Sequence, residues 1–191
     1  MGDKGARAVI LAVLMFFLAG VQQPEDVPAG PLLKATYEPG GTCDDCYAWR
    51  LSINTDGSFT LESKILPGWD TPDEWRTSSK GRLNQKQLNR LVDVIHESGF
   101  LTLLPRYSSD YELPGGAVVL VTDQDTVTIW VNVENQEHQV HVYGPEVVAG
   151  LSLPDRRHSD REAGGRFCTV WAQVLDSVKA PNRWQKAKYY R

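Results

Sequence analysis

The chain has 191 residues, a formal net charge of −4 and an apolar share of 41%. This length favours a single domain with appendages, and the apolar share is large enough to form a core. Because the chain is mildly acidic, it has no general attraction to a nucleic-acid backbone, which argues against a nucleic-acid partner.

Residues 1–20 have the three-part pattern of a signal peptide. Lys4 and Arg7 give a short basic start, and the uncharged run AVILAVLMFFLAGV extends from Ala8 to Val21. This run suits the core of a signal peptide, because a membrane span needs about 20 apolar residues. We expect cleavage, export to the periplasm or the extracellular space, and no membrane span afterwards. An uncleaved membrane anchor is the alternative.

Residues 21–31 hold several prolines and no periodic pattern, which predicts a linker. A single folded domain is expected over residues 32–179, followed by a basic C-terminal tail over 180–191. The tail is interpreted as a solvated terminus, because its charges are spread thinly. The first strand of the domain is predicted from Leu32 to Tyr37.

A β-hairpin is the clearest element of the first half. Apolar and polar residues alternate on both sides of the turn sequence NTDG, and Gly57 can adopt the positive φ that such turns require. The pattern predicts a hairpin in which Ile53 lies near Phe59 and Leu51 lies near Leu61.

Residues 67–82 read as a polar loop, and a helix is predicted after it. Asn84 can cap this helix, with Gln87 three residues later in a capping-box arrangement, and Gly99 ends it. The apolar residues follow the spacing of one buried helical face: Leu88, Leu91, Val92 and Ile95.

An antiparallel meander of three strands is predicted in the second half. The nearly all-apolar segment AVVLVT, residues 117–122, forms its first strand, and the alternating segments 127–133 and 140–143 form the next two. Residues 154–165 are expected to be a charged loop. A last helix is predicted from about residue 166 to 179, on a helical apolar stripe: Phe167, Val170, Trp171, Val174, Leu175 and Val178.

These elements predict an α+β fold with two layers. An antiparallel β-sheet, made of two hairpin or meander regions, presents one apolar face. Two amphipathic helices then cover that face and form the core.

The cysteines offer several chemistries. Cys43 and Cys46 flank two aspartates in the sequence CDDC, and in an oxidising compartment such neighbours form a disulfide. A thiol-redox pair, a metal site, and a disulfide between Cys168 and one of the two are the alternatives. Cys168 itself is expected to be a partly buried thiol at the edge of the last helical stripe.

Catalytic and metal-binding patterns are not apparent in the sequence. It contains no nucleophile elbow, no phosphate-binding glycine loop and no HExxH helix. His138 and His141 resemble a ligand pair by spacing, but an odd separation sends two strand residues to opposite faces. We therefore expect a protein that is not an enzyme and holds neither a cofactor nor a metal.

Three residues of the last two strands form a candidate partner surface: Trp130, His141 and Tyr143. If the turn centres on residues 135–136, Trp130 lies opposite His141, and Thr128 lies opposite Tyr143. All four side chains then share the face of the hairpin that points away from the core.

An aromatic patch on an outer sheet face is typical of a partner site. The alternative is that the patch is covered by the polar loop, with Trp69 or Trp75 folded over it.

The sequence also resembles a loosely related group of small bacterial domains. The similarity spans about residues 33–178 and rests on these segments: YEPGG at 37–41, Leu51–Ile53 with Asp56-Gly57, the helix with Leu88, Leu91 and Ile95, Gly99–Leu101, DTVTI at 125–129, and the Val140 strand before Pro145. The group includes the emfourin-like family, whose namesake inhibits a metalloprotease, and exported domains of unknown function. The CDDC insert, the Trp69–Trp75 loop and the basic tail depart from the emfourin-like pattern.

The resemblance implies a protein partner, with a protease as one candidate. Our main hypothesis is an exported, non-enzymatic domain that binds a protein. The alternative hypothesis is an exported thiol-redox or metal-binding protein that uses Cys43 and Cys46.

Overall fold

The computed structural model describes residues 30–40, 46–65, 74–112, 115–145 and 158–179. The predicted signal peptide, most of the linker, Cys43, Trp69 and the basic tail lie outside these residues. All structural statements below concern the described part of the chain.

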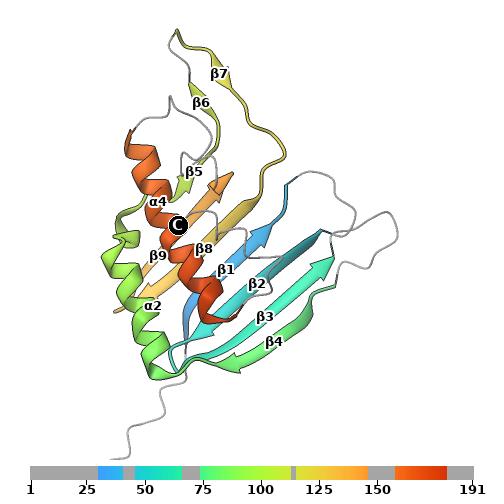
Figure 1. Cartoon of the computed structure of the whole chain (residues 1–191), viewed down its shortest axis with the longest axis vertical. Coiled ribbons are helices and arrows are strands. Elements are labelled where there is room, and N and C mark those ends of the chain that lie inside the picture. Colours follow the sequence, from blue (N-terminus) through green and yellow to red (C-terminus); the bar gives the residue numbers. More distant parts are fainter. Residues whose placement is uncertain (1–29, 41–45, 66–73, 113–114, 146–157, 180–191) are drawn as a thin grey trace, which may run out of the picture.

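The fold is α+β, as predicted, with a sheet on one side and helices on the other (Figure 1). The main sheet has the strand order β4-β3-β2-β1-β8-β9-β5, and it is antiparallel except that β5 runs parallel to β9. Its strands are β1 (Pro31–Glu38), β2 (Tyr47–Asn54), β3 (Ser58–Ile65), β4 (Arg76–Arg82), β5 (Arg106–Tyr107), β8 (Thr126–Val133) and β9 (Gln136–Tyr143). A separate two-stranded ribbon pairs β6 (Tyr111–Glu112) with β7 (Val118–Val119).

The helical layer consists of α2 (Gln85–Glu97) and α4 (His158–Ser177), with a short 3-10 helix, η1, over Phe100–Thr102. Both long helices lie on the same face of the main sheet (Figure 1).

The predicted β2–β3 hairpin is confirmed, including its register. Leu51 pairs with Leu61, and Ile53 pairs with Phe59. Gly57 has a φ of 83°, so it takes the left-handed conformation that favours glycine in such turns.

The first strand, predicted from Leu32 to Tyr37, is also confirmed, and it has a central place in the sheet. β1 pairs with β2 along one edge and with β8 along the other, antiparallel in both cases. The two predicted sheet regions are therefore joined through β1 into a single sheet.

The prediction of a polar loop over residues 67–82 is wrong for residues 76–82, which form β4. This strand pairs antiparallel with β3 at the edge of the main sheet. Its sequence RTSSKGR holds no apolar residue that could reveal a strand by alternation. The strand forms because the backbone of β3 offers it an open edge.

The predicted strand 117–122 is wrong as a member of the main sheet. Only Val118–Val119 forms a strand, and it pairs with β6 in the ribbon. β8 already pairs with β1 and β9 on its two edges, so it has no edge left for this segment. The second half of the sheet is a β8–β9 hairpin and not a three-stranded meander.

Helix α2 begins as its sequence predicts. The Asn84 side chain accepts a hydrogen bond from the amide of Gln87, and the Gln87 side chain accepts one from the amide of Asn84. The buried face includes Val94, whereas Val92 is only partly buried. The remaining buried residues are those predicted: Leu88, Leu91 and Ile95.

Helix α4 begins at His158, earlier than predicted, so the expectation of a charged loop is wrong for residues 158–165. Its first turns contact the end of α2 through Arg166. The guanidinium donates from Nε to the carbonyl of Ser98 at 2.6 Å and from Nη2 to Thr102 Oγ1 at 2.6 Å. It also donates to the carbonyl of Gly99. Arg166 therefore caps the C-terminal end of α2.

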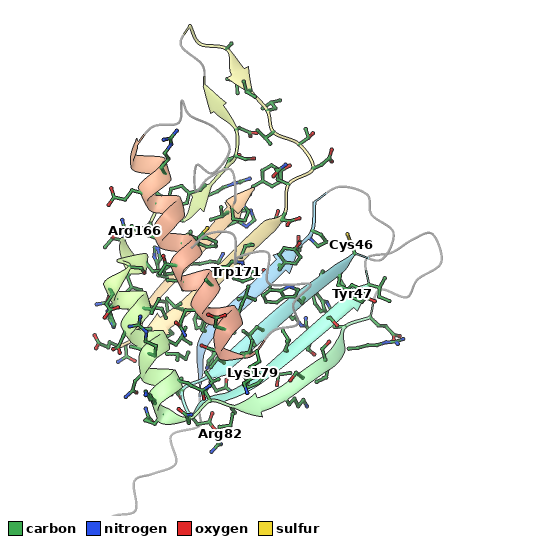
Figure 2. All side chains as sticks on the ribbon, in the orientation of Figure 1. Cys46, Tyr47, Arg82, Arg166, Trp171 and Lys179 are labelled. Atoms are coloured by element: carbon green, nitrogen blue, oxygen red, sulfur yellow. The ribbon has the colours of Figure 1, made fainter. Side chains whose placement is uncertain are left out.

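Stacked aromatic rings join the sheet to α4 in the core. Trp49 of β2 is fully buried and stacks on Trp171 of α4, with ring centroids 4.9 Å apart and planes 3° apart. Tyr37 of β1 also stacks on Trp49, with ring centroids 5.8 Å apart. The apolar stripe predicted for the last helix is buried throughout. Figure 2 shows Trp171 pointing from α4 to the sheet.

Candidate functional site

The candidate site lies on the face of the main sheet that points away from α2 and α4, which we call the outer face. Side chains of neighbouring strands line up across it in rows, as the strand register requires. One row is Glu62, Arg50, Thr36, Thr128 and His141. The next row is Thr60, Ser52, Lys34, Trp130 and Gln139.

The predicted register of the β8–β9 hairpin is wrong by one turn position. Glu134 and Asn135 both have positive φ, 53° and 63°, so the turn centres on them, as in a two-residue type I′ turn. Trp130 consequently pairs with Gln139 instead of His141, and Thr128 pairs with His141 instead of Tyr143.

The face of these side chains is nevertheless as predicted. The register error moves β9 by two residues, and a shift of two keeps every side chain on its own side of the sheet. Trp130, His141 and Tyr143 all lie on the outer face, and each is half-buried.

Trp130 is paired with a cation from the neighbouring strand. Lys34 of β1 lies directly opposite Trp130 of β8, and its Nζ is 5.1 Å from the centroid of the indole ring. A cation over an aromatic face is attracted by the ring quadrupole. The pair therefore presents an apolar ring and a positive charge together at the centre of the outer face.

His141 and Tyr143 extend this surface along β9. Thr128 Oγ1 and His141 Nδ1 are 2.9 Å apart, a hydrogen bond that orients the imidazole. The amide of Gln124 donates to the Tyr143 hydroxyl at 3.4 Å. We call the set Lys34, Trp130, His141 and Tyr143 the β8–β9 cluster.

The histidine next along β9 points the other way, as its spacing predicts. His138 lies on the helix side, where its ring meets Phe100 edge-on with centroids 5.9 Å apart. His138 and His141 are thus on opposite faces and do not share a ligand.

A second aromatic–cation group lies on the outer face across β1, over β2 and β3. The Trp75 ring has Arg50 Cζ at 4.6 Å and Lys64 Nζ at 5.1 Å from its centroid. Arg50 also donates from Nε to Glu62 Oε2 at 2.5 Å. The suggested cover of the aromatic patch by Trp75 is therefore wrong, because Trp75 contacts these cations instead.

Sequence reasoning missed Lys34 and this second group. A signal for Lys34 was present, because it is the charged residue between two apolar positions of β1, Leu33 and Ala35. Trp75 gave no signal, because it belongs to a segment that lacks strand alternation.

The thiols are placed as follows. Cys46 immediately precedes β2 (Figure 2), and Cys43 lies outside the described residues, so their disulfide stays a prediction. Cys168 is 2% exposed and is not part of a disulfide, which corrects both the suggested bridge to it and its expected partial burial. Its Sγ donates to the carbonyl of Pro145 at 3.9 Å.

Across the described ranges, no group of three or more histidine, cysteine or acidic residues is arranged to hold a metal ion.

Comparison with known proteins gives no family for this chain: no protein-family model matches it, and no curated protein matches it. Neither of the two long helices described is long and apolar enough to cross a membrane.

Proposed function

We propose that this protein is an exported, non-enzymatic domain that binds a protein partner through the β8–β9 cluster. The observation that supports the proposal is the half-exposed Trp130 ring, paired with Lys34 on a sheet face opposite both described long helices. Tryptophan, tyrosine and arginine are the residues that most often dominate binding energy at protein interfaces.

The side chains of the β8–β9 cluster are held in place before any partner binds. Trp130 is anchored in β8, and its neighbour His141 is oriented by Thr128, so a partner would have to order few side chains on this surface. Rigid aromatic side chains lose little conformational entropy on binding. The cluster thus has the character of a pre-organised hot spot.

The charges of the outer face indicate the chemistry of the partner. Lys34 adjoins the Trp130 ring, and Arg50 and Lys64 adjoin the Trp75 ring. A complementary surface would place apolar atoms against Trp130 and a carboxylate near Lys34. A protease that carries such a surface is one candidate, which the resemblance to emfourin-like domains suggests.

Capture from the native extracytoplasmic fraction tests the proposal. The wild-type chain, Trp130→Ala and Trp75→Ala would each be immobilised, and the bound proteins compared by quantitative mass spectrometry. We expect Trp130→Ala to lose the partner and Trp75→Ala to keep it, since Trp75 is a matched tryptophan under cations on the same face. Equal capture by Trp130→Ala and the wild type would contradict the site.

The proposed role in inhibition has its own measurement. A captured peptidase would be titrated with the purified chain, and we expect activity to fall stoichiometrically with the wild type and less with Trp130→Ala. If the activity of the peptidase does not change, the proposed inhibition is contradicted, whereas the proposed binding is not. Export is tested separately by the N-terminus of the native protein, which should begin after residue 20.

A further inference from the structure

The β6–β7 ribbon projects from the body of the molecule, beyond the ends of the helices and the main sheet (Figure 1). It carries exposed apolar side chains: Val118 is 62% exposed and Leu120 is 70% exposed. The segment 117–122, AVVLVT, holds no charged residue. Exposed apolar groups on a projecting element are typical of an interaction surface.

One backbone edge of this segment is used by β6, and the other faces outward. Val118 and Val119 pair with β6, and the Val121 amide donates to Asp110 Oδ1 at 3.0 Å on the same side. Backbone groups of a strand alternate between its two edges. Continued past the end of β7 to Leu120, this alternation places the amides and carbonyls of Val118 and Leu120 at the outer edge, where Figure 1 shows no described strand.

The β4 edge of the main sheet and the edge at 117–122 differ in charge. The β4 edge of the main sheet carries the cations Arg76 and Lys80 and no acid of its own, so a second β4 edge would meet it with like charges, whereas Arg82 of the same strand is ion-paired with Asp56. Such charges are a common protection against edge-to-edge pairing. The edge at 117–122 has no charge and no proline, so an identical edge meets no repulsion there.

A further strand would stabilise the ribbon. Two-stranded ribbons are marginally stable in water, and three or more strands give a sheet that is stable in its own right. An uncharged edge of high β propensity supplies that strand when it pairs with a copy of itself.

We propose that residues 117–122 are a self-association edge, and that the occupant is the same edge of a second copy of this chain. In the antiparallel arrangement, a twofold axis passes at Val119. Val118 of one copy then exchanges both backbone hydrogen bonds with Leu120 of the other copy, and Leu120 of the first copy does the same with Val118 of the second. All the exposed Val118 and Leu120 side chains gather on one face of the joined ribbons, where they contact one another.

This inference does not depend on the proposed function. The edge belongs to the ribbon, whereas the β8–β9 cluster lies on the outer face of the main sheet. A Trp130→Ala variant should therefore keep its self-association, and loss of the ribbon contact should leave the cluster intact.

Sedimentation velocity tests the proposal. Because the paired edge is short, we expect weak association, with dimer appearing as the wild-type concentration rises from about 1 μM to about 1 mM. Leu120→Lys should raise the concentration needed for dimer at least about tenfold. Leu104→Lys is the matched control, because Leu104 is 64% exposed but lies outside the ribbon, and it should behave as the wild type.

Two outcomes would overturn the proposal: a wild-type chain that stays monomeric over the whole range, or equal weakening by both lysine variants. Thermal melting of each variant confirms that it is folded, which is expected because both leucines are exposed.

Cross-linking adds a test of the register. On the axis, Val119 faces Val119 of the second copy in a non-hydrogen-bonded pair, where Cβ atoms approach closely enough for a disulfide. Val119→Cys should form an intermolecular disulfide under mild oxidation, and Leu104→Cys should not. Peptide mapping separates this bridge from any that involves the native cysteines. Equal cross-linking by the two variants would contradict the edge.

Discussion

The main sheet and the β6–β7 ribbon differ both in where their apolar side chains lie and in what their edges carry. The sheet buries apolar residues under α2 and α4, and its β4 edge is cationic. The ribbon exposes Val118 and Leu120, and the segment that carries them is uncharged. The difference teaches that a strand backed by a core can carry charges at its edge, whereas the exposed apolar segment 117–122 lacks this protection and is free to pair as we propose.

The largest expected effect is a difference in how much substitutions in the core of the main sheet and in the ribbon lower the free energy of unfolding. Trp171→Ala removes the stack on Trp49, and we expect it to lower the free energy of unfolding by about 3–5 kcal/mol. Leu120→Ala removes an exposed side chain of the ribbon and should change it by less than about 0.5 kcal/mol. Urea denaturation measures both. Similar losses of unfolding free energy in Trp171→Ala and Leu120→Ala would contradict the difference in burial between the sheet and the ribbon.

The second largest loss of stability is expected when the contact of Arg166 with the end of α2 is removed. Arg166→Ala removes the donor to the Ser98 carbonyl, whereas the Gly99 carbonyl still accepts hydrogen bonds from Thr102, and we expect a loss of about 1–3 kcal/mol. Arg90→Ala is the matched control, because it breaks only the exposed ion pair with Glu97, worth about 0–1 kcal/mol. The same urea series compares them, and a larger loss from Arg90→Ala would contradict the cap.

Removing the charges of β4 sharpens the comparison of edges. In a Leu120→Lys background, Arg76→Thr with Lys80→Thr should change stability by less than about 0.5 kcal/mol, because both side chains are exposed. We expect this variant to self-associate through the β4 edge even though Leu120→Lys blocks the edge at 117–122, because the β4 edge has lost its charge repulsion. Sedimentation velocity reads the result. A chain that stays monomeric would show that the charges do not guard this edge.

The smallest effect is a pH dependence of the β2–β3 turn. The Ser58 hydroxyl donates to the Asp56 carboxylate at 2.6 Å and, with the Ser58 amide at 2.9 Å and nearby Arg82, lowers the pKa of Asp56. The carboxylate therefore stabilises the fold above the ordinary aspartate pKa of about 3.9, and this stabilisation is lost as the pH falls through the lowered value.

Asp56→Asn should remove this small acid-side decrease from the stability profile. Unfolding measured at several acidic pH values compares the variant with the wild type. Identical slopes in the two profiles would contradict the role of the carboxylate.

Elements with their own local signals could be predicted from the sequence. The β2–β3 hairpin has both alternation and a turn glycine, and α2 has both a capping box and an apolar face. β4 and the segment 117–122 could not be placed, because side-chain patterns report burial and do not report which backbone edge is open.

The same limit applies to the candidate site. The outer face of Trp130, His141 and Tyr143 followed from parity along the strands, which survived the register error. The pairing of Lys34 with Trp130 could not be predicted, because β1 is almost a hundred residues away in sequence and only the fold brings it beside β8.

Hydrogen–deuterium exchange at low and high protein concentration tests the contrast between the two edges most directly. We predict that peptides covering 117–122 gain protection at high concentration, because the Val118 and Leu120 amides become hydrogen-bonded to a second copy. Peptides covering 76–82 should exchange equally at both concentrations. Concentration-independent exchange of 117–122, or protection gained at 76–82 instead, would contradict the account.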